Sequence, residues 1–232
     1  TNCLQKKDRL IKIVMEKNLE KLSRYEKKWV LQNINITSFL IAINRSNFLF
    51  KESFKPRQVN TIYFDNKNFS SISENLDGTF YKKKYRLRWY GDYRNIENPQ
   101  FEIKAKKGLT TYKKLFPIKI KNKIEFNFDG IEKISKLILN NIKIKFNLFP
   151  ILTTHYFRYY FISSNKKVRA TFDTNLGSSQ IYGYKNLLFK KNLENTVLEI
   201  KYDRDHDDYV KKNIKNISAR MSKSSKYVYS AF

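Results

Sequence analysis

The sequence predicts an α+β protein built mainly from antiparallel strands, with several helices. Many short segments alternate apolar and polar residues, which is typical of half-buried strands, and others repeat apolar residues at helical spacing. No internal repeat and no linker rich in proline or glycine divides the chain. We therefore expect one domain over residues 1–232.

Helical spacing of apolar residues predicts the helices. The first is an amphipathic segment at the N-terminus, where Leu10, Val14 and Leu22 recur among lysines and acids. The predicted helical segments are residues 1–22, 35–50, 130–141 and 207–217. The last begins at Asp207, where a carboxylate suits the positive end of the helix dipole.

Alternation with a period of two predicts the strands. They are residues 24–31, 58–66, 82–92, 100–107, 111–121, 154–163, 167–176 and 196–203. A loop through Asn98-Pro99 joins one pair, and a turn at Ser164-Asn165 joins another. We therefore expect antiparallel hairpins at both places.

The composition is that of a folded, strongly basic protein. Hydrophobic residues make up 41% of the 232 residues and aromatic residues 16%, which argues for a packed core. Lysine and arginine number 47 against 21 acidic residues, a formal net charge of +26. This excess favours anionic partners such as nucleic acid, membrane surface, polyphosphate or nucleotides. Lysine, asparagine and isoleucine are jointly enriched, as in AT-rich genomes, so the placement of charges says more than their total.

The few cysteines and histidines and the short apolar runs argue against several classes of protein. One cysteine, Cys3, allows no internal disulfide framework, and with only two histidines it argues against a zinc site. The longest apolar run, Phe39 to Ile43, is far shorter than a membrane-spanning helix. We expect a cytoplasmic protein, and a position at the inner face of a membrane stays open.

The predicted strands share an apolar face opposite a charged face. In KKKYRLRWYGD (82–92), Arg86 and Arg88 lie opposite Tyr85, Leu87 and Trp89, because successive side chains point to opposite faces. YEKKW, FEIKAK, VRATFD and VLEIKYD repeat this pattern. The charged faces either point to water or line the inside of a closed sheet whose outside the helices cover. A basic interior is tenable only when it is wide, wet and filled by an anion such as a phosphate chain.

A resemblance to a known family is carried by eight segments in order. They are RYEKKWVL, VNTIYFDN, GTFYKKKYRLRWYGD, FEIKAKKG, HYFRYYF, RATFDTNL, VLEIKYD and SKSSKYV. Their order resembles the VTC-type polyphosphate polymerase domain, a branch of the CYTH / triphosphate tunnel metalloenzyme superfamily, from about Arg24 to the C-terminus. The resemblance implies a closed antiparallel β-barrel of about eight strands, a triphosphate tunnel, with helices packed outside. It also implies an ATP-dependent polyphosphate polymerase, which moves the γ-phosphate of ATP onto inorganic polyphosphate with Mn²⁺ or Mg²⁺.

The resemblance also implies roles for matching residues. Catalytic roles fall on Arg86, Arg88, Lys104, Arg158 and Lys226. Phosphate or nucleotide binding falls on Lys28, Tyr156, Arg169, Lys201, Lys223 and Ser225. Glu199 of L-E-I-K matches the metal-binding glutamate, and either Lys113 or Lys114 belongs to the site. ATP and inorganic polyphosphate are the expected partners, nucleic acid is not, and association with a membrane or with membrane subunits stays open.

Other polar and aromatic residues have simpler readings. Glu102 could equally bind a metal or pair with a neighbouring cation such as Lys104. Asp65 is expected to cap the turn after TIYF. Trp29, Trp89 and Tyr90 are expected in outer packing.

Three alternatives to the polymerase stay open. A non-catalytic module of the same fold would bind polyphosphate or nucleotides without turnover. A nucleic-acid binder would explain the charge and the aromatics among lysines, but the sequence holds no RRM, KH, zinc-finger or helix-turn-helix signature. Hydrolysis of short triphosphates is disfavoured, because Arg24 stands where hydrolytic relatives carry the first glutamate of E-x-E-x-K.

Overall fold

The computed structural model describes residues 24–32, 34, 36–44, 46–108, 110–142, 147–181, 191–193, 195–214, 221 and 225–231. The helix expected at residues 1–22 lies outside this range, as does Lys223. The helices are α2 (Ile36–Asn44), α3 (Ser70–Leu76), α4 (Phe128–Asn141), η1 (Arg204–His206), α5 (Asp207–Asn213) and α6 (Lys226–Tyr229). None of the helices in this described part is long and apolar enough to cross a membrane.

Strands dominate the described chain. They are β1 (Arg24–Gln32), β2 (Lys51–Asp65), β3 (Tyr81–Tyr90), β4 (Asn95–Ile96), β5 (Gln100–Lys107), β6 (Thr110–Pro117), β7 (Ile124–Glu125), β8 (Phe149–Ile162), β9 (Val168–Gln180), β10 (Lys191–Leu193) and β11 (Asn195–Asp203). The main sheet has the order β1-β11-β9-β8-β2-β3-β5-β6, with β10 beside β9, while β4 and β7 form a separate pair. Every pairing is antiparallel.

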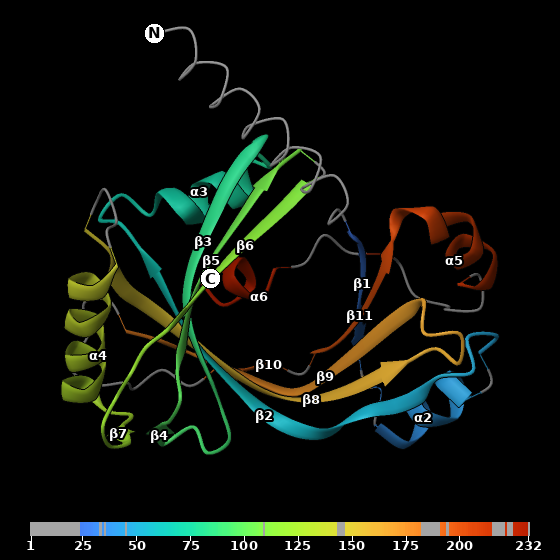
Figure 1. Ribbon diagram of the computed structural model, residues 1–232, viewed down its shortest axis with the longest axis horizontal. Helices are drawn as coiled ribbons and strands as arrows, with labels where there is room; N and C mark the ends of the chain where they lie inside the picture. Colours follow the sequence, from blue (N-terminus) through green and yellow to red (C-terminus); the bar gives the residue numbers. More distant parts are fainter. Residues whose placement is uncertain are drawn as a thin grey trace, which may run out of the picture.

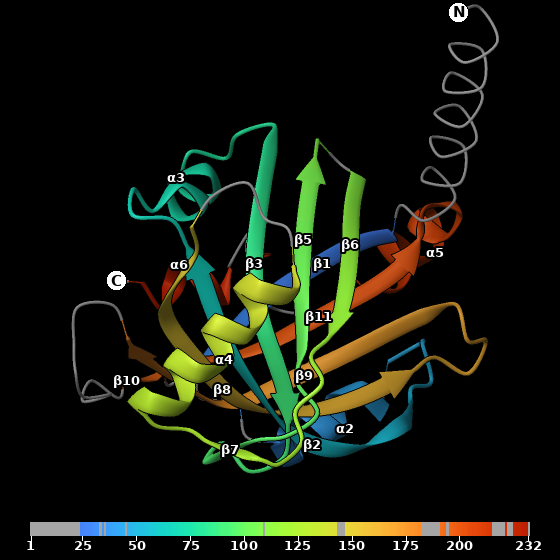
Figure 2. The same cartoon turned by 60° about the vertical axis from the view of Figure 1, so that its left-hand side comes forward.

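The main sheet bends back over itself. Figures 1 and 2 show β3, β5 and β6 standing steeply across the oblique strands β2, β8 and β9, so the sheet encloses a concave face. Among the described residues the order ends at β1 and β6, which do not pair with each other. The antiparallel α+β fold is therefore confirmed, whereas closure of the sheet into a barrel is not.

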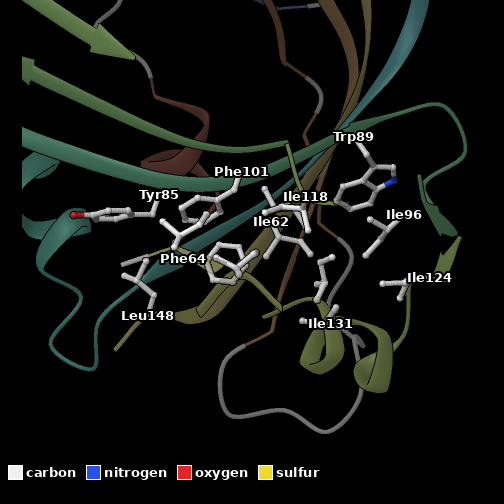
Figure 3. Close-up of a cluster of buried hydrophobic side chains, with 14 of the residues drawn as sticks. Ile62, Phe64, Tyr85, Trp89, Ile96, Phe101, Ile118, Ile124, Ile131 and Leu148 are labelled. Carbon is white, nitrogen blue, oxygen red and sulfur yellow. The ribbon is translucent and has the colours of Figure 1, made fainter. Parts of the chain in front are cut away.

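One hydrophobic core lies between the convex side of the sheet and α4. Leu87 and Trp89 of β3 and Phe101 of β5 point to this side and are fully buried. Ile131, together with Ile134 and Ile138, packs against them from one face of α4, as Figure 3 shows in part. The Asn127 side chain caps α4 by accepting from the Gly130 N–H at 2.8 Å.

A second core covers the other half of the convex side. Phe39 of α2 stacks on Phe172 of β9, with ring centroids 3.8 Å apart. Val210 of α5 and Ile200 of β11 belong to the same core. The apolar faces of the strands thus turn outward under helices, and their charged faces turn inward, as the inward-lining interpretation expects.

Asp65 fixes the corner where β2 leads into α3. Its carboxylate accepts the backbone N–H of Asn66 at 2.9 Å, so it caps the turn after β2 as expected. It also accepts from Ser71 and Ile72 in the first turn of α3, at 3.0 and 3.1 Å. The Tyr227 hydroxyl donates to the same carboxylate at 2.8 Å. This bond attaches α6, which lies within the curve of the sheet in Figure 1.

Several elements differ in extent from the sequence predictions. The helix expected at 35–50 ends at Asn44, because Phe48 and Phe50 instead enter the second core beside a strand that begins at Lys51. The strand expected at 58–66 therefore begins seven residues earlier. Helix α3 and the short α6 were not predicted, because each carries fewer than two full helical turns of sequence signal.

Candidate functional site

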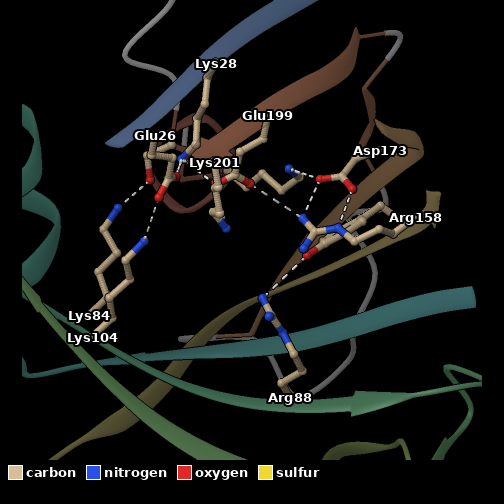
Figure 4. Close-up of polar contacts among 12 residues, drawn as sticks. Glu26, Lys28, Lys84, Arg88, Lys104, Arg158, Asp173, Glu199 and Lys201 are labelled. Atoms are coloured by element: carbon tan, nitrogen blue, oxygen red, sulfur yellow. Dashed lines mark hydrogen bonds and ion pairs between the residues drawn. The ribbon is translucent and has the colours of Figure 1, made fainter. Parts of the chain in front are cut away.

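The concave face gathers charged side chains from facing parts of the sheet. In Figure 4, Lys84, Lys104 and Arg88 rise from β3 and β5 toward side chains of β1, β8, β9 and β11. The latter side chains are Glu26, Lys28, Arg158, Asp173, Glu199 and Lys201. Cross-strand register explains the grouping: Lys28 lies opposite Glu199, and Glu26 lies opposite Lys201.

Arg158, Asp173 and Lys226 form a fully paired group that we call the aspartate cluster. The Arg158 guanidinium donates to both oxygens of Asp173, at 2.6 and 2.7 Å. Lys226 Nζ donates to the same carboxylate at 2.5 Å. Burial alone would raise the pKa of Asp173, but the charges of Arg158 and Lys226 hold it below its usual range. The cluster anchors α6 to the middle of the sheet.

Tyr156 and Arg88 adjoin the aspartate cluster. Arg88 Nη2 donates to the Tyr156 hydroxyl at 3.5 Å, and Lys226 Nζ lies 4.7 Å from the centroid of the Tyr156 ring. Arg88 Nε is buried and has no hydrogen-bond partner among the described residues. A buried guanidinium N–H without a partner is costly unless a ligand or water accepts from it. This atom is therefore a donor available to a bound anion.

Arg86 and Glu102 form a second ion pair, on neighbouring strands. Glu102 also accepts from Lys113 Nζ at 3.0 Å. Burial would raise the pKa of Glu102, yet Arg86 and Arg88 lower it to about 2. Glu102 is therefore ionised in the structure and serves as a counter-ion to Arg86 and Lys113. Lys113 points to the concave face, while Lys114 lies over the ring of Phe116 on the outer side.

Lys84 and Lys104, which we call the lysine pair, have a different environment. Lys84 Nζ donates to the Ser225 hydroxyl at 2.7 Å, and Lys104 Nζ lies 3.4 Å from a Glu26 oxygen. Burial and the charges of Lys28 and Lys104 lower the pKa of Lys84 to about 7. Burial lowers the pKa of Lys104 to about 8, although Glu26 opposes the shift. Excess positive charge thus collects at this part of the face.

Two carboxylates converge on Lys28. Its Nζ lies 2.5 Å from a Glu26 oxygen and 3.9 Å from a Glu199 oxygen. Lys201 Nζ contacts Glu199 at 2.9 Å. Burial would raise the pKa of Glu199, but Lys201 and Lys28 hold it well below its usual range, so the group is ionised. Glu26 and Glu199 are carboxylates that could hold a divalent ion, since Mg²⁺ is usually held by one or two carboxylates plus phosphates. Within the described residues, no larger group of metal-binding side chains occurs.

A family comparison adds to this geometry. The sequence pattern of the VTC domain matches residues 23–231. The chain belongs to the VTC domain family. No curated protein matches the chain.

Comparison with solved structures supports the fold of this VTC domain. A proposed adenylate cyclase from Vibrio parahaemolyticus superposes with a TM-score of 0.52 at 12% identity, covering 90% of this chain and 98% of that one. A proposed adenylyl cyclase from Hippeastrum with a dominant triphosphatase activity gives 0.39 at 11% identity, covering 88% and 93%. The Mimivirus capping enzyme triphosphatase gives 0.40 at 13% identity, covering 88% and 92%. The likeness of fold rests on the first of these, because the other scores are low.

The VTC domain brings most of the expected site residues together. The described members of that set that face one another across the concavity are Lys28, Arg86, Arg88, Lys104, Tyr156, Arg158, Glu199, Lys201, Ser225 and Lys226. Arg169 lies beside Lys201 in register, and its side chain is exposed. Lys223 falls outside the described residues.

Sequence reasoning left some members of the site without a role. Alternation placed Asp173 and Glu26 on charged faces, but it could not show that Asp173 joins two cations or that Glu26 lies between Lys28 and Lys104. Tyr90 was assigned to outer packing, and this was wrong. Its ring lies 4.0 Å from the Arg57 guanidinium, on the face that carries Arg88, two residues earlier in the strand. The alternation that places Arg88 on the concave face also places Tyr90 there, because the two residues are two positions apart in β3.

Proposed function

We propose that this VTC domain is an ATP-dependent polyphosphate polymerase that binds nucleotide and polyphosphate on its concave face. The observation that carries the proposal is the convergence of cations from facing parts of the sheet. Lys104 of β5 reaches Glu26 of β1 across the concavity, at 3.4 Å. A ligand placed there would meet Lys84 and Lys104 on one side and Lys28 and Lys201 on the other.

Phosphoryl transfer suits such a site. A terminal oxygen of the polyphosphate forms a bond to the γ-phosphorus of ATP. The bond between this phosphorus and the oxygen that bridges it to the β-phosphorus breaks. ADP leaves, and the chain is longer by one phosphate. Little covalent help is needed, because positioning and neutralisation of charge carry most of the catalysis. Arg86, Arg88 and Arg158 supply fixed guanidinium groups, which match phosphate oxygens in planar pairs.

Glu199 and Glu26 would hold a divalent ion, Mn²⁺ or Mg²⁺. When bound, this ion would neutralise charge on phosphate oxygens. Lys28 Nζ contacts both carboxylates. The lysine would then be displaced toward the phosphates, since its ammonium and a metal ion compete for the same oxygens.

Polymer synthesis tests the proposal. Purified protein with ATP and Mn²⁺ should produce an acid-labile polymer, and Arg86→Ala or Glu199→Gln should reduce the rate by about a hundredfold or more. Arg94→Ala is the matched control, because Arg94 is exposed and pairs only locally with Asp92. Absence of polymer from the wild-type protein, or equal rates in all variants, would contradict the proposal.

One observation favours a second candidate, a polyphosphate-binding module without turnover. Glu199 is held by Lys201 at 2.9 Å and lies near Lys28 and Arg158, so its carboxylate already has cationic partners. A chain that keeps those contacts would bind phosphate without a metal. Tight polyphosphate binding that is unchanged by Mn²⁺, without any turnover of ATP, would favour this candidate.

A further inference from the structure

An aromatic group lies on the concave face beyond the charged residues. The Arg57 guanidinium lies 4.0 Å from the Tyr90 ring centroid and 5.3 Å from that of Tyr160. Arg57 Nε also donates to the Tyr160 hydroxyl at 3.1 Å. Phe54 meets the Tyr160 ring edge to face, with centroids 5.9 Å apart, and is itself 65% exposed. These four residues form what we call the stacking platform.

An irregularity in β2 builds the stacking platform. Phe54 pairs with Tyr160 and Arg57 pairs with Arg158, so three steps along β2 match two along β8. In a regular strand, residues 54 and 57 would point to opposite faces. The extra residue of this β-bulge, at Lys55-Pro56, brings both side chains to the same face. Bulges of this kind commonly re-aim side chains beside functional sites.

The stacking platform adjoins the phosphate site directly. Arg57 lies beside Arg158 of the aspartate cluster on the neighbouring strand. Tyr160 lies beside Thr171, which in turn lies beside Glu199. Neighbouring strands are about 4.8 Å apart, so Tyr160 is about 10 Å from the Glu199 backbone. A nucleoside triphosphate has a comparable span between its base and its outer phosphates.

We propose that Phe54, Arg57, Tyr90 and Tyr160 bind the nucleobase of the nucleoside triphosphate whose phosphates lie on the concave face. This inference rests on the proposed phosphate binding of that face. The exposed ring of Phe54 offers the base a surface on which to stack, and the planar Arg57 group, held between two tyrosines, offers a cationic edge. Tyr90 and Tyr160 position Arg57, which keeps the platform preorganised.

Stacking predicts low selectivity among bases. Every base presents a π-face, so a platform of rings and one guanidinium tolerates different bases. ATP and GTP should therefore bind this domain with affinities that agree within about threefold. The platform should distinguish a nucleotide from inorganic tripolyphosphate, which has no base to stack.

Calorimetric titration without divalent metal separates this inference from the polymerase proposal. ATP and inorganic tripolyphosphate are titrated into wild type, Phe54→Ala, Phe54→Trp and Phe128→Ala. We expect Phe54→Ala to weaken ATP binding by about tenfold and to leave tripolyphosphate affinity unchanged. Phe54→Trp should restore ATP binding. Phe128→Ala should match wild type, because Phe128 is an exposed ring on α4, which packs outside the sheet.

The outcomes are distinguishable. If wild type binds tripolyphosphate and ATP equally and Phe54→Ala changes neither, the stacking platform is wrong and the phosphate site stands. Equal loss of both ligands in Phe54→Ala also overturns the platform, because the effect then does not depend on a base. If wild type binds neither ligand, the proposed function fails together with the inference.

Discussion

The aspartate cluster and the lysine pair hold similar cations on the same concave face, yet their surroundings differ. Arg158 shares a bidentate ion pair with a carboxylate that also receives Lys226. Lys84 Nζ donates to the Ser225 hydroxyl and is surrounded by other cations. The pKa of Arg158 is therefore raised well above its usual value, although burial opposes this, and the pKa of Lys84 falls to about 7.

This difference separates cations whose charge the protein itself balances from cations that lack counter-charge. Charges that are buried and mutually paired hold the sheet and α6 together. Cations that are buried without enough counter-charge are costly until an anion arrives. The lysine pair is therefore the part of the site where bound phosphate should change the protein most.

The largest expected effect follows loss of the shared carboxylate. Asp173→Asn leaves Arg158 and Lys226 buried without their anion, so the free energy of unfolding should fall by about 3–5 kcal/mol in urea denaturation. Asp208→Asn is the control, because the Asp208 side chain is fully exposed, and it should change stability by less than about 0.5 kcal/mol. Equal stability of Asp173→Asn and wild type would remove the distinction between the two regions.

The lysine pair should show the opposite behaviour. Lys84→Met removes a charge that is costly without ligand, so the free protein should become more stable, while affinity for tripolyphosphate should fall about tenfold. Thermal unfolding and calorimetric titration measure the two effects. Lys83→Met is the matched control on the same strand, because Lys83 lies over the Tyr81 ring, on the opposite face. A Lys84→Met protein that is less stable and binds normally would make Lys84 structural.

The pH dependence of stability has a defined sign. The Lys84 pKa is about 7 in the folded protein and about 10.4 in the unfolded chain, so the unfolded chain binds more protons between these values. The free energy of unfolding should therefore rise with pH from about 7 to about 10. Lys84→Met should reduce this slope in urea titrations over the same range. Identical slopes in the two proteins would show that the Lys84 pKa is not lowered.

The smallest expected effect concerns the exposed Arg169. Water screens the ionic contacts of this exposed side chain, so Arg169→Gln should weaken tripolyphosphate binding by less than about fivefold. Arg88→Gln should weaken it far more, because the buried Arg88 Nε has no partner in the part of the chain that the structure describes. Equal losses at the two positions would contradict the burial argument.

The sequence predicted which residues line the concave face better than it predicted which of them contact one another. The period of two in strands β3, β5, β9 and β11 places Arg86, Lys104, Arg169 and Glu199 on one face without reference to other strands. Which partner each residue meets depends on the order of the strands and on bulges. Neither the meeting of Lys226 with Asp173 nor the shared orientation of Phe54 and Arg57 follows from local pattern.

Residue alternation could not predict whether the sheet closes into a barrel. Alternation gives each strand two faces, but it does not say how far a sheet curls or whether its edge strands pair. The described β1 and β6 remain unpaired with each other, while Lys104 and Glu26 make a side-chain contact across the concavity.

Proton uptake on binding tests the central claim most directly. ATP is titrated into the protein at about pH 8.5, where its phosphates are fully ionised, in two buffers of different ionisation enthalpy. Bound phosphate should raise the pKa values of Lys84 and Lys104 from about 7 and about 8, so binding should take up protons. A variant with both Lys84→Met and Lys104→Met should lose this uptake. ATP binding without proton uptake, or uptake that persists in the double variant, would contradict the claim that the lysine pair awaits an anion.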